Sequence, residues 1–261
     1  MSEDILSRHP PPADARVRYG QDPNQFIDLR LPVSKDKKSL PVVINIHGGF
    51  WRAKYNLDHA GHLCAALTAR GYATANVEYR RVGNDGGGWP GTFADIRSAY
   101  QFVIQNAQKN NFDVRRIVVM GHSAGGQLAL CLAGHEARVT RVVSLAGVVD
   151  LQRAYQLHLS NDAVVEFLRG TPTEVPDHYR EADPMQLSIR KARQWLIHGS
   201  ADDTVPPVFG RDYVAAKQKR MGEAREDTQL LEIAGADHFD LIDPKSNAWK
   251  QVEDIVHRLT E

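Results

Sequence analysis

The stretch Gly121-His122-Ser123-Ala124-Gly125-Gly126 decides the fold of this 261-residue chain. It follows an apolar, β-branched run at residues 116–120 and precedes a helix-forming run at residues 127–133. A serine between glycines at a strand-to-helix turn is presented as a nucleophile, because the glycines let strand and helix approach without a Cβ between them. The stretch therefore predicts that Ser123 is a nucleophile; the alternative is an ordinary glycine-rich turn.

Strand and helix patterns alternate on both sides of this turn. Predicted helices begin near residues 56, 92, 124, 208 and 245, and predicted strands cover residues 42–46, 72–79, 116–120, 139–145, 194–197 and 229–233. Such alternation predicts an α/β fold with a mostly parallel central sheet and helices on both faces. Residues 16–19 and 25–31 predict an antiparallel hairpin at one edge. The spacing of Thr92 and Asp95 predicts a capping box at a helix start.

The length and the composition indicate one domain. A chain of 261 residues can bury one large sheet, so residues 1–261 are predicted to form a single domain. Residues 1–15 are predicted to be an N-terminal arm. Residues 150–185 break the rhythm and hold three prolines, which predicts a short cap-like insertion of helices over the active-site end of the sheet.

The charge balance excludes several classes of partner. Lys plus Arg and Asp plus Glu both number 32, so nothing favours nucleic acid or an anionic membrane surface as a partner.

No apolar run approaches the roughly 20 residues of a membrane span, and residues 1–12 lack the apolar core of a signal peptide. Cys64 and Cys131 lie among apolar residues of predicted helices, which predicts buried free thiols and a cytoplasmic protein.

A serine hydroxyl needs a base, and the base needs a group that orients it. Behind a nucleophile turn of this kind, the acid and then the histidine follow the serine along the chain. His238 follows the predicted strand 229–233, and its ordinary pKa of about 6.5 suits a general base. Asp202 is the first carboxylate after the predicted strand 194–197 and is the preferred acid, with Asp203 as the alternative.

The same region contains residue types that bind metals: Asp202, Asp203, Asp237, His198 and His238. The serine turn already explains the order and placement of the acid and the histidine, so no metal and no cofactor are predicted.

The run His47-Gly48-Gly49-Phe50-Trp51 directly follows the predicted strand 42–46. Backbone N–H groups of a glycine-rich loop at this position can stabilise the oxyanion of a tetrahedral intermediate. We expect these donors to be the N–H groups of Gly49 and Phe50, together with that of Ala124 after the serine.

Three motifs resemble the α/β-hydrolase superfamily and, within it, the esterase branch that includes the kynurenine formamidases (arylformamidases). The motifs are residues 47–51, which fit an H-G-G-x-W form, the serine turn at residues 121–125, and Asp237-His238-Phe239-Asp240-Leu241-Ile242. The resemblance extends over nearly the full chain. It implies an α/β-hydrolase fold and Ser123, Asp202 and His238 as a catalytic triad.

Residues 77–90 follow a strand and should lie at the active-site end. Tyr79, Arg80 and Trp89 are candidates to shape the acyl or leaving-group pocket. The alternative is that Glu78 and the arginines form an ion-pair network while Trp89 packs the loop. Trp51 is either a pocket wall or packing beneath the oxyanion loop. We assign Trp51, Tyr79 and Trp89 to the pocket.

The predicted activity is that of a serine carboxylesterase, which cleaves carboxylic esters through an acyl-enzyme. The predicted substrates are small esters, because the insertion is too short for a large lid. The resemblance implies an arylformamidase acting on N-formyl-kynurenine as the alternative. A peptidase acting on short acyl-peptides is third, and a non-catalytic binder of the same fold is fourth. The predicted partner is a small ester or amide, and a homodimer is compatible with the sequence.

Overall fold

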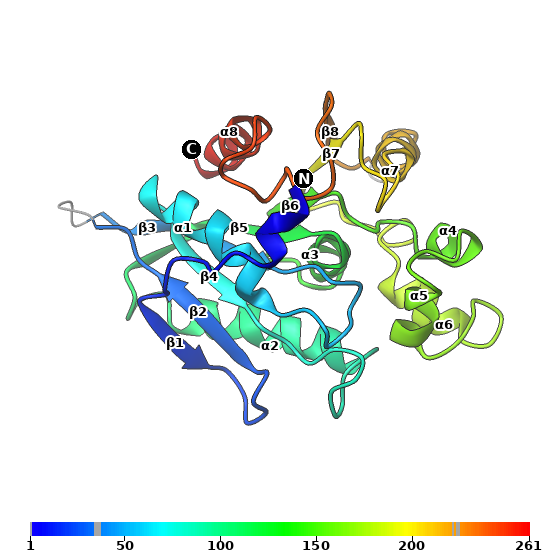
Figure 1. Cartoon of the computed structure of the whole chain (residues 1–261), viewed down its shortest axis with the longest axis horizontal. Helices are drawn as coiled ribbons and strands as arrows, with labels where there is room; N and C mark the ends of the chain where they lie inside the picture. The colour runs from blue at the N-terminus through cyan, green and yellow to red at the C-terminus, as the bar shows by residue number, and fades with distance from the viewer. Residues whose placement is uncertain (1, 34–37, 221, 223–224) are drawn as a thin grey trace.

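The computed structural model of the chain describes residues 2–33, 38–220, 222 and 225–261. Within them the strands form one eight-stranded sheet in the order β1-β2-β4-β3-β5-β6-β7-β8 (Figure 1). Neighbours from β4 to β8 are parallel, whereas β1 and β2 form an antiparallel hairpin at one edge. The predicted sheet and hairpin are confirmed. The strands are β1 (Ala15–Arg18), β2 (Phe26–Arg30), β3 (Leu40–Ile46), β4 (Ala73–Val77), β5 (Phe112–His122), β6 (Arg141–Leu145), β7 (Arg193–Gly199) and β8 (Thr228–Ile233).

Helices cover both faces of the sheet, as predicted. One face packs against α1 (Gly61–Ala69) and α8 (Trp249–Thr260), and the other packs against α2 (Gly91–Gln105), α3 (Ala124–His135) and α7 (Val208–Gln218). The segment 150–185 forms the short helices α4 (Leu151–Gln156), α5 (Ala163–Leu168) and α6 (Pro176–Ala182) beside α3. Two 3-10 turns, η1 (Ser2–Leu6) and η2 (Leu57–Ala60), pack against each other.

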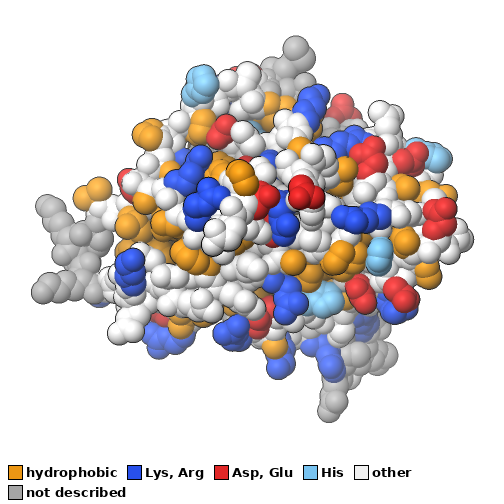
Figure 2. Space-filling view, turned by 90° about the horizontal axis from the view of Figure 1, so that it is seen from below, with side chains coloured by type: hydrophobic (Ala, Val, Ile, Leu, Met, Phe, Trp, Pro, Cys, Tyr) orange, Lys and Arg blue, Asp and Glu red, His pale blue; other side chains and the backbone are white. Residues whose placement is uncertain are grey.

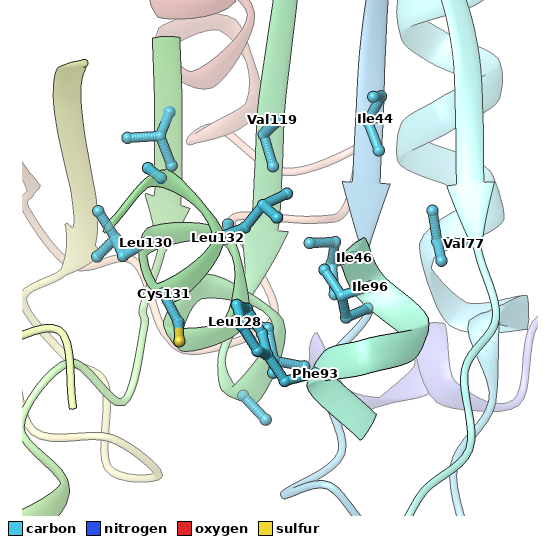
Figure 3. Packing of buried hydrophobic residues seen from close by; sticks show 14 of the residues in the cluster. Ile44, Ile46, Val77, Phe93, Ile96, Val119, Leu128, Leu130, Cys131 and Leu132 are labelled. Atoms are coloured by element: carbon cyan, nitrogen blue, oxygen red, sulfur yellow. The ribbon is translucent and has the colours of Figure 1, made fainter. Parts of the chain in front are cut away.

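The central strands are buried on both sides, which is why their sequences are continuous apolar runs. Successive side chains of a strand point to opposite faces, so Val43 packs in the cluster under α1 and α8 whereas Ile44 packs under α2 and α3. Figure 3 shows the latter cluster: Ile44 and Val119 lie on the neighbouring strands β3 and β5, Leu132 of α3 lies near Val119, and Leu128 of α3 lies near Phe93 of α2.

The start of α2 differs from the predicted capping box. The residue before the helix is Pro90, and no side chain caps the first turn. Thr92 instead donates its hydroxyl to the carbonyl of Arg80, and Asp95 accepts hydrogen bonds from the backbone and guanidinium of Arg80. The prediction is wrong because these two side chains hold the preceding loop rather than the helix terminus.

On the face drawn in Figure 2, basic, acidic and apolar side chains are intermixed, and neither sign of charge dominates. This distribution agrees with the formal net charge of zero.

A glycine in α3 gives a test of the packing between α3 and β3. A Cβ on Gly125 would lie 2.0 Å from the carbonyl oxygen of Ile46, so Gly125→Ala requires the backbone to move. We expect this variant to lose about 3 kcal/mol or more of the free energy of unfolding, measured by urea denaturation. The control is Gly134→Ala in the same helix, whose Cβ would meet the flexible side chain of Leu187. Equal losses in the two variants would contradict the argument.

Candidate active site

Ser123 occupies a strained turn between β5 and α3. Its backbone has φ 56° and ψ −120°, a conformation that costs a non-glycine residue on the order of 1–3 kcal/mol. Neighbouring backbone holds it there: the Ser123 N–H donates to the carbonyl of Leu145 at 2.8 Å, and the Ser123 carbonyl accepts from the N–H of Gly126 at 2.9 Å. The predicted strand–turn–helix context is therefore present, with the serine at the carboxyl end of the central strand.

His238 and Asp202 are brought together from the loops after β8 and β7. The Nδ1 atom of His238 lies 2.7 Å from Oδ2 of Asp202, and both side chains are buried. The other oxygen, Oδ1, accepts hydrogen bonds from the N–H groups of Thr204 and Val205, so the carboxylate is fixed in orientation. Asp203 is exposed and contacts the Thr204 hydroxyl. Of the two candidate acids, Asp202 is the one that contacts the histidine.

The protonation states of this pair follow from its surroundings. Burial alone would raise the pKa of Asp202, but hydrogen bonds from His198 and His238 outweigh burial and hold the pKa well below its usual range. An ionised carboxylate only accepts hydrogen bonds, so Nδ1 of His238 carries the proton and donates it. The Nε2 atom of a neutral His238 is then left as a proton acceptor.

Ser123 and His238 line the same cavity, which has a volume of about 220 Å³. It lies beyond the carboxyl ends of β3, β5, β7 and β8, where ligands bind in open parallel sheets. The full set of lining residues is Leu6, Gly49, Phe50, Tyr55, His59, His122, Ser123, Thr204, His238 and Phe239.

Three backbone N–H groups near the serine are available to a ligand. Gly49, Phe50 and Trp51 have positive φ angles, and within the described part of the chain the N–H groups of Gly49, Phe50 and Ala124 donate to no other protein group. Gly49 and Phe50 line the cavity, and Ala124 directly follows Ser123. Unpartnered N–H groups of this kind are what an oxyanion needs, so the role predicted from the glycine-rich motif stays a prediction that this geometry allows.

A buried network of charges supports the loop that carries these donors. His47 contacts Oε1 of Glu78 through Nε2 at 3.0 Å, and the Arg81 guanidinium lies 2.9 Å from the same oxygen. Burial would raise the pKa of Glu78, but His47 and Arg81 lower it below the ordinary value. Tyr79 stacks on His47 and donates its hydroxyl to the His47 carbonyl at 2.8 Å. Glu78 and Arg81 can be buried next to this loop because each is the charged partner of the other.

The aromatic residues assigned to the pocket do not line this cavity. Trp51 is 1% exposed, donates Nε1 to Gln127 at 3.0 Å and stacks on Phe167 of α5. Trp89 stacks on Phe93 of α2, and Tyr79 is wholly buried against His47. For Trp51 and Trp89 the structure therefore supports the packing alternative that the sequence left open. The assignment of Tyr79 to the pocket is wrong, because its ring stacks on His47 and its hydroxyl donates to the His47 carbonyl.

The predicted cap segment also lies away from the cavity. None of the described residues of segment 150–185 lines it. The segment instead supports the oxyanion loop from outside, because Arg52 donates to the carboxylate of Glu166 in α5 at 2.7 and 3.0 Å and to the hydroxyl of Ser160 at 3.1 Å.

Six lining residues were not among the predicted site residues: Leu6, Tyr55, His59, His122, Thr204 and Phe239. His122 directly precedes Ser123 in the serine turn. Phe239 and Thr204 are next to predicted site residues, so their place in the chain was a usable signal. Tyr55 and His59 follow the oxyanion motif at a distance that no motif specifies. Leu6 had no signal, since only the fold brings the first residues to the site.

Two further histidines at the cavity are held neutral by burial. Burial lowers the pKa of His59 to about 3, with a further contribution from the charge of His47, and burial also lowers the pKa of His122 well below its ordinary value. Nε2 of His122 donates to the carbonyl of His238 at 2.9 Å, because a carbonyl can only accept. His122 thereby fixes the backbone of the loop that carries His238.

Among the described residues, no group of three or more His, Cys, Asp or Glu side chains is arranged to hold a metal ion. No helix in that part of the chain is both long and apolar enough to span a bilayer. Cys64 and Cys131 are buried free thiols, as predicted.

The parallel sheet, the serine turn after β5 and the acid and histidine after later strands together define an α/β-hydrolase fold. The BD-FAE family model matches residues 27–214, most of the length of the chain. The chain therefore belongs to the BD-FAE family.

Known relatives of the chain include esterases. It is 28% identical over 270 residues to the esterase LipC of Mycobacterium tuberculosis and 26% identical over 273 residues to a probable isoprenylcysteine α-carbonyl methylesterase, ICMEL2, of Arabidopsis thaliana. These alignments cover 93% and 92% of this chain, which spans only 65% and 62% of the length of the two relatives. These relatives do not specifically support the arylformamidase branch, so this branch stays a prediction. The cytoplasmic location and the homodimer also stay predictions.

Solved structures agree on the fold. A truncated carbohydrate esterase from gut microbiota superposes with a TM-score of 0.79 over 97% of this chain and 99% of its own, at 21% sequence identity.

Because His59 and His122 are buried in the neutral form, we predict that the free energy of unfolding decreases as the pH falls. Unfolded His59 binds a proton below a pH of about 6.5, whereas the folded protein leaves it neutral down to a pH of about 3. Unfolding in this window takes up a proton, so the stability that is fully present above pH 6.5 falls as the pH decreases, by up to about 1.4 kcal/mol per pH unit for this group. We expect His59→Gln to make the pH dependence less steep, measured by urea denaturation between pH 7 and pH 4. His9→Gln, at an exposed position, is the control. An unchanged slope in His59→Gln would contradict the assignment.

Proposed function

We propose that this protein is a serine hydrolase that cleaves small carboxylic esters, with Ser123 as nucleophile, His238 as general base and Asp202 as the group that orients His238. One observation carries the proposal: the Asp202–His238 pair, bonded at 2.7 Å, opens on the same cavity as Ser123 in its strained turn. The esterase names of the relatives support the same reaction class.

The reaction begins with attack of the Ser123 oxygen on the ester carbonyl, while Nε2 of His238 takes the hydroxyl proton. Asp202 keeps the imidazole in the required tautomer and stabilises the imidazolium. The N–H groups of Gly49, Phe50 and Ala124 stabilise the oxyanion. His238 then donates its proton to the leaving alcohol. A water molecule, deprotonated by His238, hydrolyses the acyl-enzyme and regenerates Ser123.

The cavity supports small, uncharged substrates. Its volume of about 220 Å³ is only moderately larger than the roughly 150 Å³ that holds a benzene molecule. The lining is mainly aromatic and aliphatic, through Leu6, Phe50, Tyr55 and Phe239, and contains no Lys, Arg, Asp or Glu among the described residues. A charged substrate would lose its hydration there without gaining an ionic partner.

A second candidate is the hydrolysis of an aryl formamide, N-formyl-kynurenine. The observation that favours it is the aromatic part of the lining, since Tyr55 and Phe239 offer ring faces and edges to an aryl group. The same triad would act on the formyl carbonyl, with the aryl amine as leaving group.

Labelling with a fluorophosphonate probe tests whether Ser123 is activated. We expect the wild-type protein to be labelled and Ser123→Ala to remain unlabelled, since the probe reacts with a serine hydroxyl that a general base activates. Ser200→Ala is the control, because Ser200 lies in the loop before Asp202 and its hydroxyl accepts from the Gly235 N–H. Folded wild-type protein without labelling would favour a non-catalytic binder.

The substrate class is tested by comparing kcat/KM for p-nitrophenyl acetate, butyrate and octanoate with that for N-formyl-kynurenine. We expect the short-chain esters to be the better substrates, because the cavity is small and uncharged. A preference for N-formyl-kynurenine by orders of magnitude would replace the esterase proposal by the arylformamidase one. Cleavage of short acyl-peptides in preference to both would assign the protein as a peptidase.

The two neighbouring aspartates give a matched pair of variants. We expect Asp202→Asn to lower kcat by roughly 10³- to 10⁴-fold, since an amide stabilises the wrong tautomer of the histidine. Asp203→Asn should keep a kcat close to that of the wild-type protein, because Asp203 is exposed and has no contact with His238. Steady-state kinetics on p-nitrophenyl acetate decides, and the reverse ranking would show that Asp203 orients the base.

A further inference from the structure

The N-terminal segment contributes to the cavity at Ser123, although the sequence indicated only an arm. Leu6, at the end of η1, lines the cavity with Ser123 and His238 and is 37% exposed. Ile5 beside it is fully buried in the cluster that also holds residues of α1 and α8. Figure 1 shows this turn, in dark blue, over the middle of the molecule rather than at its periphery. Leu6 is therefore an apolar side chain held at the site by its neighbour.

Charged and polar contacts fix the segment that follows. The Arg8 guanidinium donates to Oδ2 of Asp243, and the Arg8 carbonyl lies 3.3 Å from Nε2 of His62 in α1. Further along, the carbonyl of Pro11 accepts from the guanidinium of Arg30 in β2 at 2.7 Å. The segment is thus attached to β2, to α1 and to the loop after His238.

The attachment at Asp243 links the segment to the catalytic loop. Asp243 follows His238 by five residues, and Leu241 and Ile242 between them are fully buried. The N-terminal turn also packs against η2, which carries His59 at the cavity. Two walls of the cavity are therefore in contact with η1 or with the segment behind it.

We propose that Leu6 is a specificity-determining residue, whose side chain closes one side of the cavity and limits the length of the apolar acyl group that it accepts. The inference rests on the proposed esterase function. The leucine side chain occupies space that additional methylene groups of a longer acyl chain would need. Because Ile5 and Arg8 hold the segment on either side, the backbone at Leu6 cannot move away from the cavity without breaking buried or ionic contacts.

The test is the acyl-length profile of Leu6→Ala, measured as kcat/KM for p-nitrophenyl acetate, butyrate and octanoate. We expect the ratio of octanoate to acetate to rise by about tenfold or more, since one methylene in an apolar pocket changes kcat/KM by roughly 10- to 200-fold. Leu6→Trp should lower the ratio of butyrate to acetate. The control is Leu157→Ala, which alters an exposed leucine that does not line the cavity.

Arg8→Gln tests the ionic contact that holds the N-terminal segment separately from the Leu6 side chain that lines the cavity. It keeps the leucine side chain but removes the ionic contact between Arg8 and Asp243, so the segment that holds Leu6 becomes less restrained and the octanoate-to-acetate ratio should rise in the same direction by a smaller factor. An unchanged acyl profile in both Leu6 variants, with unchanged acetate hydrolysis, would overturn the proposal. Absence of acetate hydrolysis and of fluorophosphonate labelling in the wild-type protein would instead contradict the esterase function, so the two failures are distinguishable.

Discussion

The close approach of three backbone segments at the serine turn is the constraint on which the rest of the site depends. A Cβ on Gly125 would lie 2.0 Å from the Ile46 carbonyl, and one on Gly121 would lie 2.1 Å from the Gly125 carbonyl. β3, β5 and α3 can therefore meet only where side chains are absent. The register places Ile46 opposite Gly121, so the oxyanion loop after β3 and the serine after β5 begin at the same level of the sheet.

The loop donors depend on a second constraint, which is electrostatic. A buried glutamate is costly unless opposite charges and hydrogen-bond donors compensate it, and Glu78 has His47, Arg81 and the N–H of Leu57 as neighbours. Removing one member would leave a buried charge without its partner, so the network keeps one arrangement. That rigidity maintains the unusual φ angles of Gly49 and Phe50, whose N–H groups must stay directed away from the protein.

The sequence predicted those parts of the molecule that local physics specifies. The parallel sheet followed from apolar runs alternating with helical patterns, and the placement of Ser123, Asp202 and His238 followed from motifs that directly succeed strands. The roles of Trp51 and Trp89 could not be predicted, because an aromatic residue after a strand can face the ligand or the core, and tertiary packing alone decides between them. The prediction of a capping box at Thr92 was wrong for a related reason, because Thr92 and Asp95 form hydrogen bonds with Arg80 instead.

Leu6 marks the limit of such prediction most clearly, because its position depends on contacts separated by most of the chain. Arg8 and Asp243 are 235 residues apart in the sequence, and neither belongs to a motif. Ser123, Asp202, His238 and the oxyanion-motif residues Gly49 and Phe50 follow the carboxyl ends of β5, β7, β8 and β3, so the parallel sheet itself brings them to one end of the molecule. The sheet does not determine which segments form the walls of the cavity. Those segments are held there by contacts such as that between Arg8 and Asp243. In this fold the sheet therefore positions Ser123, Asp202 and His238, whereas segments packed around it, such as η1 and η2, supply Leu6 and His59 to the cavity wall.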